Sequence, residues 1–158
     1  MTSPRLAQDV LLWLTANGWS PARDIGEEAG ELVRVCVQHS ERQGVPLVPV
    51  LAAVHVIRTY GRLRLPQPNT PGVAWVMEPT VGYEGDAAAI MQLAAGLGTA
   101  LFPVGYEASE GGLLLVDEKG RFFHLHHTGG YYLGNDEFDA FARFLQGLSD
   151  PDAEEYFV

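Results

Sequence analysis

Apolar residues recur every three or four positions through the first third of the chain, which is the spacing of helices that bury one face. Ser3-Pro4 is typical of a helix start and Asn17-Gly18 of a helix end. Ser20-Pro21 predicts the start of a second helix that ends before Gly44, and a third helix is predicted to end at Tyr60-Gly61. The apolar positions of the three predicted helices are Leu6, Val10, Trp13 and Leu14, then Ile25, Ala29, Leu32, Val33, Cys36 and Val37, then Val50, Val54 and Ile57. The stripe of the third helix is more typical of a core than of a binding groove.

The pattern changes after residue 61, where short β-type runs replace the helical spacing. The predicted strands are residues 62–65, 73–77 and 100–104, followed by a three-stranded system in residues 112–134 with a turn at residues 117–120. Pro103 has no backbone N–H to donate, so it predicts an edge position or a bulge in its strand.

Two further helices accompany these strands. Asp86 is placed to cap a helix over residues 87–97, and Asn135 or Asp136 is placed to cap a closing helix. The apolar face of the closing helix consists of Phe138, Phe141, Phe144 and Leu145. This order predicts an α+β fold in which N-terminal helices pack on a mostly antiparallel sheet and a C-terminal helix closes the domain.

The length of 158 residues suits one domain, and 47% hydrophobic composition is enough for a core. We expect a single domain over residues 1–149 and an acidic tail over residues 150–158, which frays unless its last three residues dock. Cys36 is the single cysteine, which excludes an internal disulfide. The N-terminus does not resemble a signal peptide and the apolar stretches are too short for a membrane span, so we expect a cytoplasmic protein.

The net charge of −10 is unevenly distributed. Residues 1–64 carry 7 Arg and 6 acidic residues, a net of +1, whereas the remainder carries 3 basic and 14 acidic residues, a net of −11. A negative field of this size repels nucleic acid and attracts a basic partner. Solubility alone is the other explanation of the same charge.

Motifs for catalysis are weak in this chain. Ser109 and Thr128 lack the Gly-x-Ser-x-Gly context of a nucleophile elbow. His124 and His126 would share one face of a strand and could hold zinc with a third ligand such as Asp117 or Glu118, but the sequence contains no clear third ligand. We therefore expect no enzyme, no metal and no cofactor, and keep a small metal-dependent hydrolase as the less favoured alternative.

Four segments, taken in order, resemble the third subgroup of the SUKH superfamily of bacterial immunity proteins. Residues 17–24 resemble its G-W-x-P-x-R-D entry, residues 59–64 its turn into the first strand, residues 101–105 its L-x-P-V-G strand and residues 113–122 its hairpin. The resemblance spans roughly residues 11–147. It implies an immunity protein of a polymorphic toxin system, which binds a cognate toxin domain, often a nuclease, in the cytoplasm of the producing cell.

The resemblance and the charge together suggest a partner-binding surface. We expect it in the loop 106–112, the turn 117–119, the strands 124–132 and the helix start 136–139. The candidate contact residues are Tyr106, Glu107, Glu110, Asp117, Glu118, His124, His126, Tyr131, Tyr132, Asp136, Glu137 and Asp139. Acidic side chains would pair with basic toxin residues, and exposed tyrosines would add contact area.

For its partners, we expect a basic toxin domain, no direct binding to nucleic acid, no membrane, and a monomer or weak homodimer. The alternative is an adaptor of the same fold that binds a housekeeping or regulatory protein.

Overall fold

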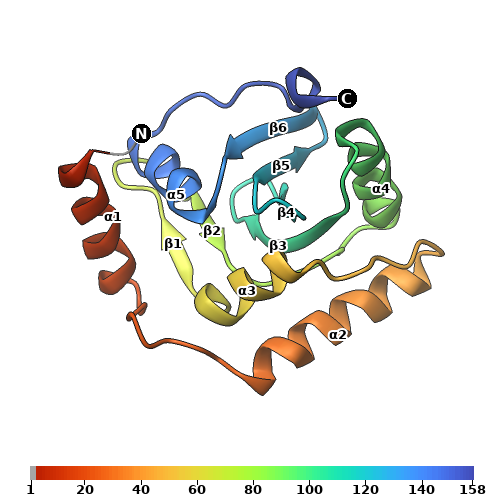
Figure 1. Ribbon diagram of the computed structural model, residues 1–158, viewed down its shortest axis with the longest axis horizontal. Coiled ribbons are helices and arrows are strands. Elements are labelled where there is room, and N and C mark those ends of the chain that lie inside the picture. Colours follow the sequence, from red (N-terminus) through yellow and green to blue (C-terminus); the bar gives the residue numbers. More distant parts are fainter. Residues whose placement is uncertain (1–2) are drawn as a thin grey trace.

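The computed structural model describes residues 3–158 and contains one six-stranded antiparallel sheet whose strands follow chain order (Figure 1). The strands are β1 (Arg64–Pro66), β2 (Ala74–Val76), β3 (Leu101–Glu107), β4 (Leu113–Asp117), β5 (Phe122–His126) and β6 (Gly129–Gly134). The helices are α1 (Pro4–Ala16), α2 (Glu27–Arg42), α3 (Leu51–Tyr60), α4 (Asp86–Leu97) and α5 (Glu137–Gln146), with a short 3₁₀ turn at Ala153–Tyr156. The α+β prediction, with N-terminal helices and a closing C-terminal helix, is confirmed.

Two of the three predicted N-caps are confirmed. Ser3 accepts a hydrogen bond from Leu6 N–H at 3.2 Å, and Asp136 accepts one from Asp139 N–H at 2.8 Å. Asp86 was wrongly predicted as a cap: it is the first residue of α4, the N-cap is Gly85, and the Asp86 carboxylate accepts from Tyr83 N–H in the preceding loop. The second helix was predicted to start at Ser20-Pro21 but begins only at Glu27. The intervening residues form a link whose Ile25 N–H donates to Arg58 O of α3 at 3.0 Å.

Pro103 lies in an interior strand, because β3 pairs with both β2 and β4. β2 pairs with β3 only at Tyr106 and Glu107, so Pro103 itself is paired on one side alone, with Leu115 of β4. The bulge is also present: the register between β3 and β4 shifts between Pro103 and Gly105. A Cβ at Gly105 would lie 2.4 Å from Val76 O, so close strand approach requires glycine at the bulge.

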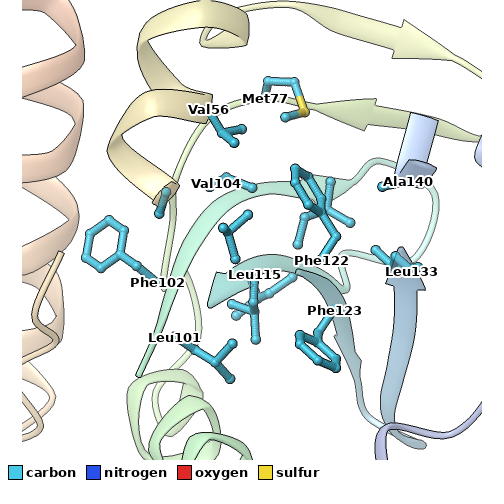
Figure 2. Packing of buried hydrophobic residues seen from close by; sticks show 14 of the residues in the cluster. Val56, Met77, Leu101, Phe102, Val104, Leu115, Phe122, Phe123, Leu133 and Ala140 are labelled. Carbon is cyan, nitrogen blue, oxygen red and sulfur yellow. The ribbon is translucent and has the colours of Figure 1, made fainter. Parts of the chain in front are cut away.

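Aromatic side chains fill the space between one face of the sheet and α5. Trp75 of β2 stacks on Phe144 with ring centroids 4.2 Å apart, and Phe122 of β5 meets Phe141 edge-on at 6.3 Å. Trp13 of α1 completes this layer, with its ring centroid 5.9 Å from Phe141. Figure 2 shows the sheet side chains Val104, Leu115 and Phe122 in the same buried cluster as Val56, Met77 and Ala140.

The other face of the sheet is covered by α4 and the C-terminal segment. Tyr132 N–H donates to Pro151 O at 2.8 Å, Tyr156 stacks on Tyr132 at 4.2 Å, and Val158 N–H donates to Gly96 O of α4 at 3.0 Å. The expectation that residues 150–158 fray was wrong, and the alternative that the last residues dock was right. This segment covers the β6 edge of the sheet, where unpaired backbone groups invite association with another chain.

Candidate partner-binding surface

The residues expected to form one surface fall into two groups at opposite ends of the sheet. In the antiparallel register Leu113 pairs with Leu125 at one end of β4, and Val116 pairs with Phe122 near the other. The four residue steps from Leu113 to Asp117 span about 13 Å. The first group is Tyr106, Glu107, Glu110, His124, His126 and Tyr131. The second group is Asp117, Glu118, Tyr132, Asp136, Glu137 and Asp139.

Glu107 organises its own loop and is only 8% exposed. Its carboxylate accepts hydrogen bonds from Ala74 N–H at 3.4 Å, Ser109 N–H at 2.7 Å, Glu110 N–H at 3.1 Å and the Ser109 hydroxyl. Burial opposes the charge, but these donors outweigh it and hold the pKa of Glu107 below its usual value. The expectation that Glu107 is an exposed contact residue is therefore wrong, because its acceptor sites are used inside the molecule.

Asp117 and Tyr132 are likewise internal. Asp117 is 0% exposed and accepts from Lys119 N–H, Arg121 N–H and Arg121 Nε at 2.9, 2.9 and 2.7 Å, which closes the β4–β5 turn. Tyr132 is 7% exposed, and its hydroxyl donates to Asn135 Oδ1. Burial is the first cause that raises the pKa of Tyr132 to about 12. Both side chains are buried and form hydrogen bonds within the fold, so the expectation that they are exposed contact residues is wrong for both.

The acidic residues at the start of α5 are largely occupied by local contacts. Asp136 caps the helix, Asp139 accepts from Asn135 N–H at 2.9 Å, and Glu137 lies 3.6 Å from His55 of α3. Carboxylates at a helix N-terminus are favoured by the helix dipole. The positions of Asp136, Glu137 and Asp139 therefore have a structural cause apart from any partner.

Glu118, which follows β4, is exposed and accepts from the Thr99 hydroxyl at 3.1 Å.

The first group contains a connected polar network on the ends of β5 and β6. Glu110 Oε2 lies 2.6 Å from His126 Nε2, and His126 Nδ1 lies 3.0 Å from Thr128 Oγ1. Thr128 Oγ1 in turn lies 2.7 Å from the Tyr131 hydroxyl. The contacts of Thr128 with His126 and Tyr131 order the β5–β6 turn, and Glu110 of the β3–β4 loop lies against His126 with its side chain largely exposed.

His124 lies next to this network but inside the fold. Burial, and then the neighbouring His126, hold the pKa of His124 below its usual value. Its ring lies over Gly112, where a Cβ would be 2.0 Å from Nε2. Glycine at this position is therefore what allows the ring to lie there.

The geometry offers no support for a metal-dependent hydrolase. The rings of His124 and His126 are 5.9 Å apart, and His126 Nε2 faces Glu110. Asp117 and Glu118, the proposed third ligands, lie at the far end of β4. Within residues 3–158 no group of three or more His, Cys, Asp or Glu side chains is arranged to hold a metal ion.

Two adjoining pockets form a groove beside the first group, which we call the hairpin groove. The larger pocket, of about 760 Å³, lies between α2, residues 78–86 and the β3–β4 loop. The smaller, of about 420 Å³, continues from Tyr83 and Glu110 to His126 and His127. The residues shared by both pockets are Tyr83, Asp86, Glu110, Gly111 and Leu113.

Sequence reasoning missed most of this groove. Tyr83 is not among the residues that sequence reasoning assigned to the partner-binding surface, although its place between Gly82 and Glu84-Gly85 is a local signal for exposure. No local pattern marks Glu78, Asp86 or His39 as neighbours of Glu110, since they are far apart in the chain.

The comparison with protein families gives one match. A family model described as SUKH-3 immunity protein matches residues 6–147. The chain belongs to the SUKH-3 immunity protein family. No curated protein and no solved structure matches it significantly.

The matched range runs from α1 to the residue after α5, so the docked C-terminal segment lies outside it. Family membership supports a role as an immunity protein that binds a cognate toxin, and SUKH immunity proteins are in general not enzymes. Among the described helices, none is long and apolar enough to cross a membrane.

Proposed function

We propose that this chain neutralises the toxin domain of a polymorphic toxin system by stoichiometric binding in the cytoplasm of the producing cell. The observation that carries the proposal is the match to the SUKH-3 family over residues 6–147. Neutralisation of this kind needs no cofactor and no turnover, and the polar side chains and the exposed Tyr83 are groups that a protein partner can contact.

The charge of the chain favours a basic toxin, such as a nuclease. A nuclease needs a positive cleft to bind phosphate, and the second half of this chain carries a net charge of −11. Opposite charges accelerate encounter and lower the free energy of the complex at low salt. The acidic surface is proposed to occupy the cleft or to lie beside it and block access.

Co-expression tests the proposal directly. The toxin domain encoded beside this gene is expressed in cells with and without this chain. We expect cell death without the chain, survival with it, and a complex of both proteins on size-exclusion chromatography. Death in both cultures, with no complex between the purified proteins, would contradict an immunity role and favour an adaptor that binds a different protein.

A further inference from the structure

Resting on the proposed function, we infer that the hairpin groove is where the toxin docks, and that its occupant is a basic segment whose Arg or Lys side chain lies against Tyr83. The volume of each of its two pockets lies within the range of pockets that bind small molecules, about 300–1,000 Å³, so the groove has room for a partner's side chain. Its larger part alone measures about 760 Å³.

The charge of the groove selects the occupant. Glu78, Asp86 and Glu110 line it, and the described lining contains no Lys or Arg. Glu78 has a cation nearby, since Arg62 Nη1 lies 3.8 Å from its Oε1, so Asp86 and Glu110 are the carboxylates without a Lys or Arg partner in the described part of the chain. Asp86 uses Oδ2 to accept from Tyr83 N–H at 2.9 Å, and Oε2 of Glu110 lies 2.6 Å from His126 Nε2. The second oxygen of each carboxylate makes no hydrogen bond within residues 3–158. A cationic side chain would compensate these charges, whereas a nucleic acid or an acidic peptide would be repelled.

Tyr83 provides the aromatic contact. It is 73% exposed, the most exposed aromatic side chain of the described chain. A cation over a tyrosine face is attracted by the ring quadrupole, and tyrosine is among the residues that dominate interface energies. An exposed tyrosine beside carboxylates is thus suited to an Arg or Lys side chain.

The wall that holds Tyr83 is pre-organised. Gln43, just after α2, donates through Nε2 to Val81 O at 2.7 Å and to Tyr83 O at 3.0 Å. Its Oε1 accepts from Ala87 N–H of α4 at 2.9 Å. One side chain thereby joins the end of α2, the loop and the start of α4. A loop held in this way loses little conformational entropy on binding.

The opposite wall is fixed as well. Glu107 holds the backbone of Ser109 and Glu110, and the Glu110 carboxylate lies beside His126, with Oε2 2.6 Å from Nε2. The two walls, residues 78–86 and the β3–β4 loop, line the same pocket from different parts of the chain. This arrangement gives a rigid, open and negatively charged site, which a protein segment can enter without rearranging the fold.

The test measures binding of the purified full chain to an inactivated form of its cognate toxin domain by isothermal titration calorimetry. Tyr83→Ala and Glu110→Lys are the groove variants, and Glu110→Gln removes the charge while keeping the side-chain size. Asp9→Lys on α1 is the matched charge-reversal control, because Asp9 is exposed and absent from the groove lining. Leu12→Ala is the matched truncation of an exposed side chain.

We expect Tyr83→Ala and Glu110→Lys each to raise Kd about tenfold or more, Glu110→Gln to raise it less, and both controls to stay within about twofold. Glu110→Lys should also reduce the dependence of Kd on salt. Circular dichroism and thermal melts confirm that each variant is folded.

The outcomes separate the two proposals. If the wild-type chain binds and rescues while the groove variants bind equally well, the hairpin groove is not the docking site and the immunity function stands. Equal losses in the groove variants and in Asp9→Lys would show a general charge effect and overturn this location. If the wild-type chain neither binds nor rescues, the proposed function fails and the docking site fails with it.

Discussion

Replacing Glu107 by Ala tests whether this carboxylate supports the fold or meets a partner. Ala74 N–H, which is buried, would lose its acceptor, and an unsatisfied buried donor costs about 1–3 kcal/mol. Ser109 N–H and Glu110 N–H lie in exposed residues and can bond water instead, so each contributes about 1 kcal/mol or less. We therefore expect the free energy of unfolding to fall by about 3 kcal/mol.

Urea denaturation followed by tryptophan fluorescence measures this loss. With a slope of about 2 kcal/mol per M urea, the midpoint should fall by about 1.5 M. Glu107→Gln keeps one acceptor oxygen and should lose roughly half as much. Glu110→Ala is the control, because it removes an exposed carboxylate whose contact with His126 is worth about 1 kcal/mol or less. A Glu107→Ala midpoint within about 0.3 M of wild type would refute the structural role of this side chain.

Three further predictions concern Gly112, His124 and the C-terminal segment. Gly112→Ala should reduce the free energy of unfolding by about 1–3 kcal/mol in denaturant titration, because the new Cβ collides with the His124 ring. The lowered pKa of His124 means that the unfolded chain binds a proton more readily, so stability should be full above about pH 6.5 and fall as the pH drops below it. His124→Gln should flatten this part of the stability–pH curve. Deleting residues 150–158 should lower the melting temperature and promote self-association in light scattering, since it uncovers the β6 edge.

Each of these has its own control. Combining Gly112→Ala with His124→Ala should cost less than the sum of the two changes, and strict additivity would argue against the collision. His127→Gln, an exposed neighbour, should leave the pH profile unchanged, and an equal flattening would implicate the turn instead of His124. Tyr156→Ala should weaken docking of the C-terminal segment without uncovering the whole edge, so the full deletion must be the more severe change.

Hydrophobic spacing predicted the helices well because helix formation is local. The apolar stripe of α1 and the caps Ser3 and Asp136 appear where the pattern placed them. The stripe predicted for α3 was largely wrong: Ile57 is buried as expected, but Val50 is the N-cap, Val54 is half-buried, and the rest of the buried face is Ala53, Val56 and Tyr60. The start of α2 was misplaced, because Ser20-Pro21 has the chemistry of a helix start although the link it begins is held by contacts to α3. Local signals thus identified elements reliably and boundaries less so.

Acidic residues were harder to assign, because composition does not reveal which way a carboxylate faces. Asp117 had a usable signal, since Asp followed three residues later by Gly120 is typical of a turn in which the carboxylate accepts backbone N–H groups. Glu107 had no such signal, because one of its donors, Ala74, lies 33 residues away on another strand. Tyr132 was expected to be exposed but is covered by Tyr156 from the C-terminal segment.

The sequence by itself determined the α+β class, the order of the elements and membership of the SUKH-3 family, because all three depend on local periodicity, turn residues and the order of motifs along the chain. Only the tertiary structure decided which acidic residues stay exposed, how the C-terminal segment docks and where a groove forms. The hairpin groove joins His39, Tyr83, Glu110 and His126 from four separate segments. Their proximity depends on how α2, the loop before α4 and the β3–β4 hairpin pack against one another, and no spacing along the chain encodes that packing.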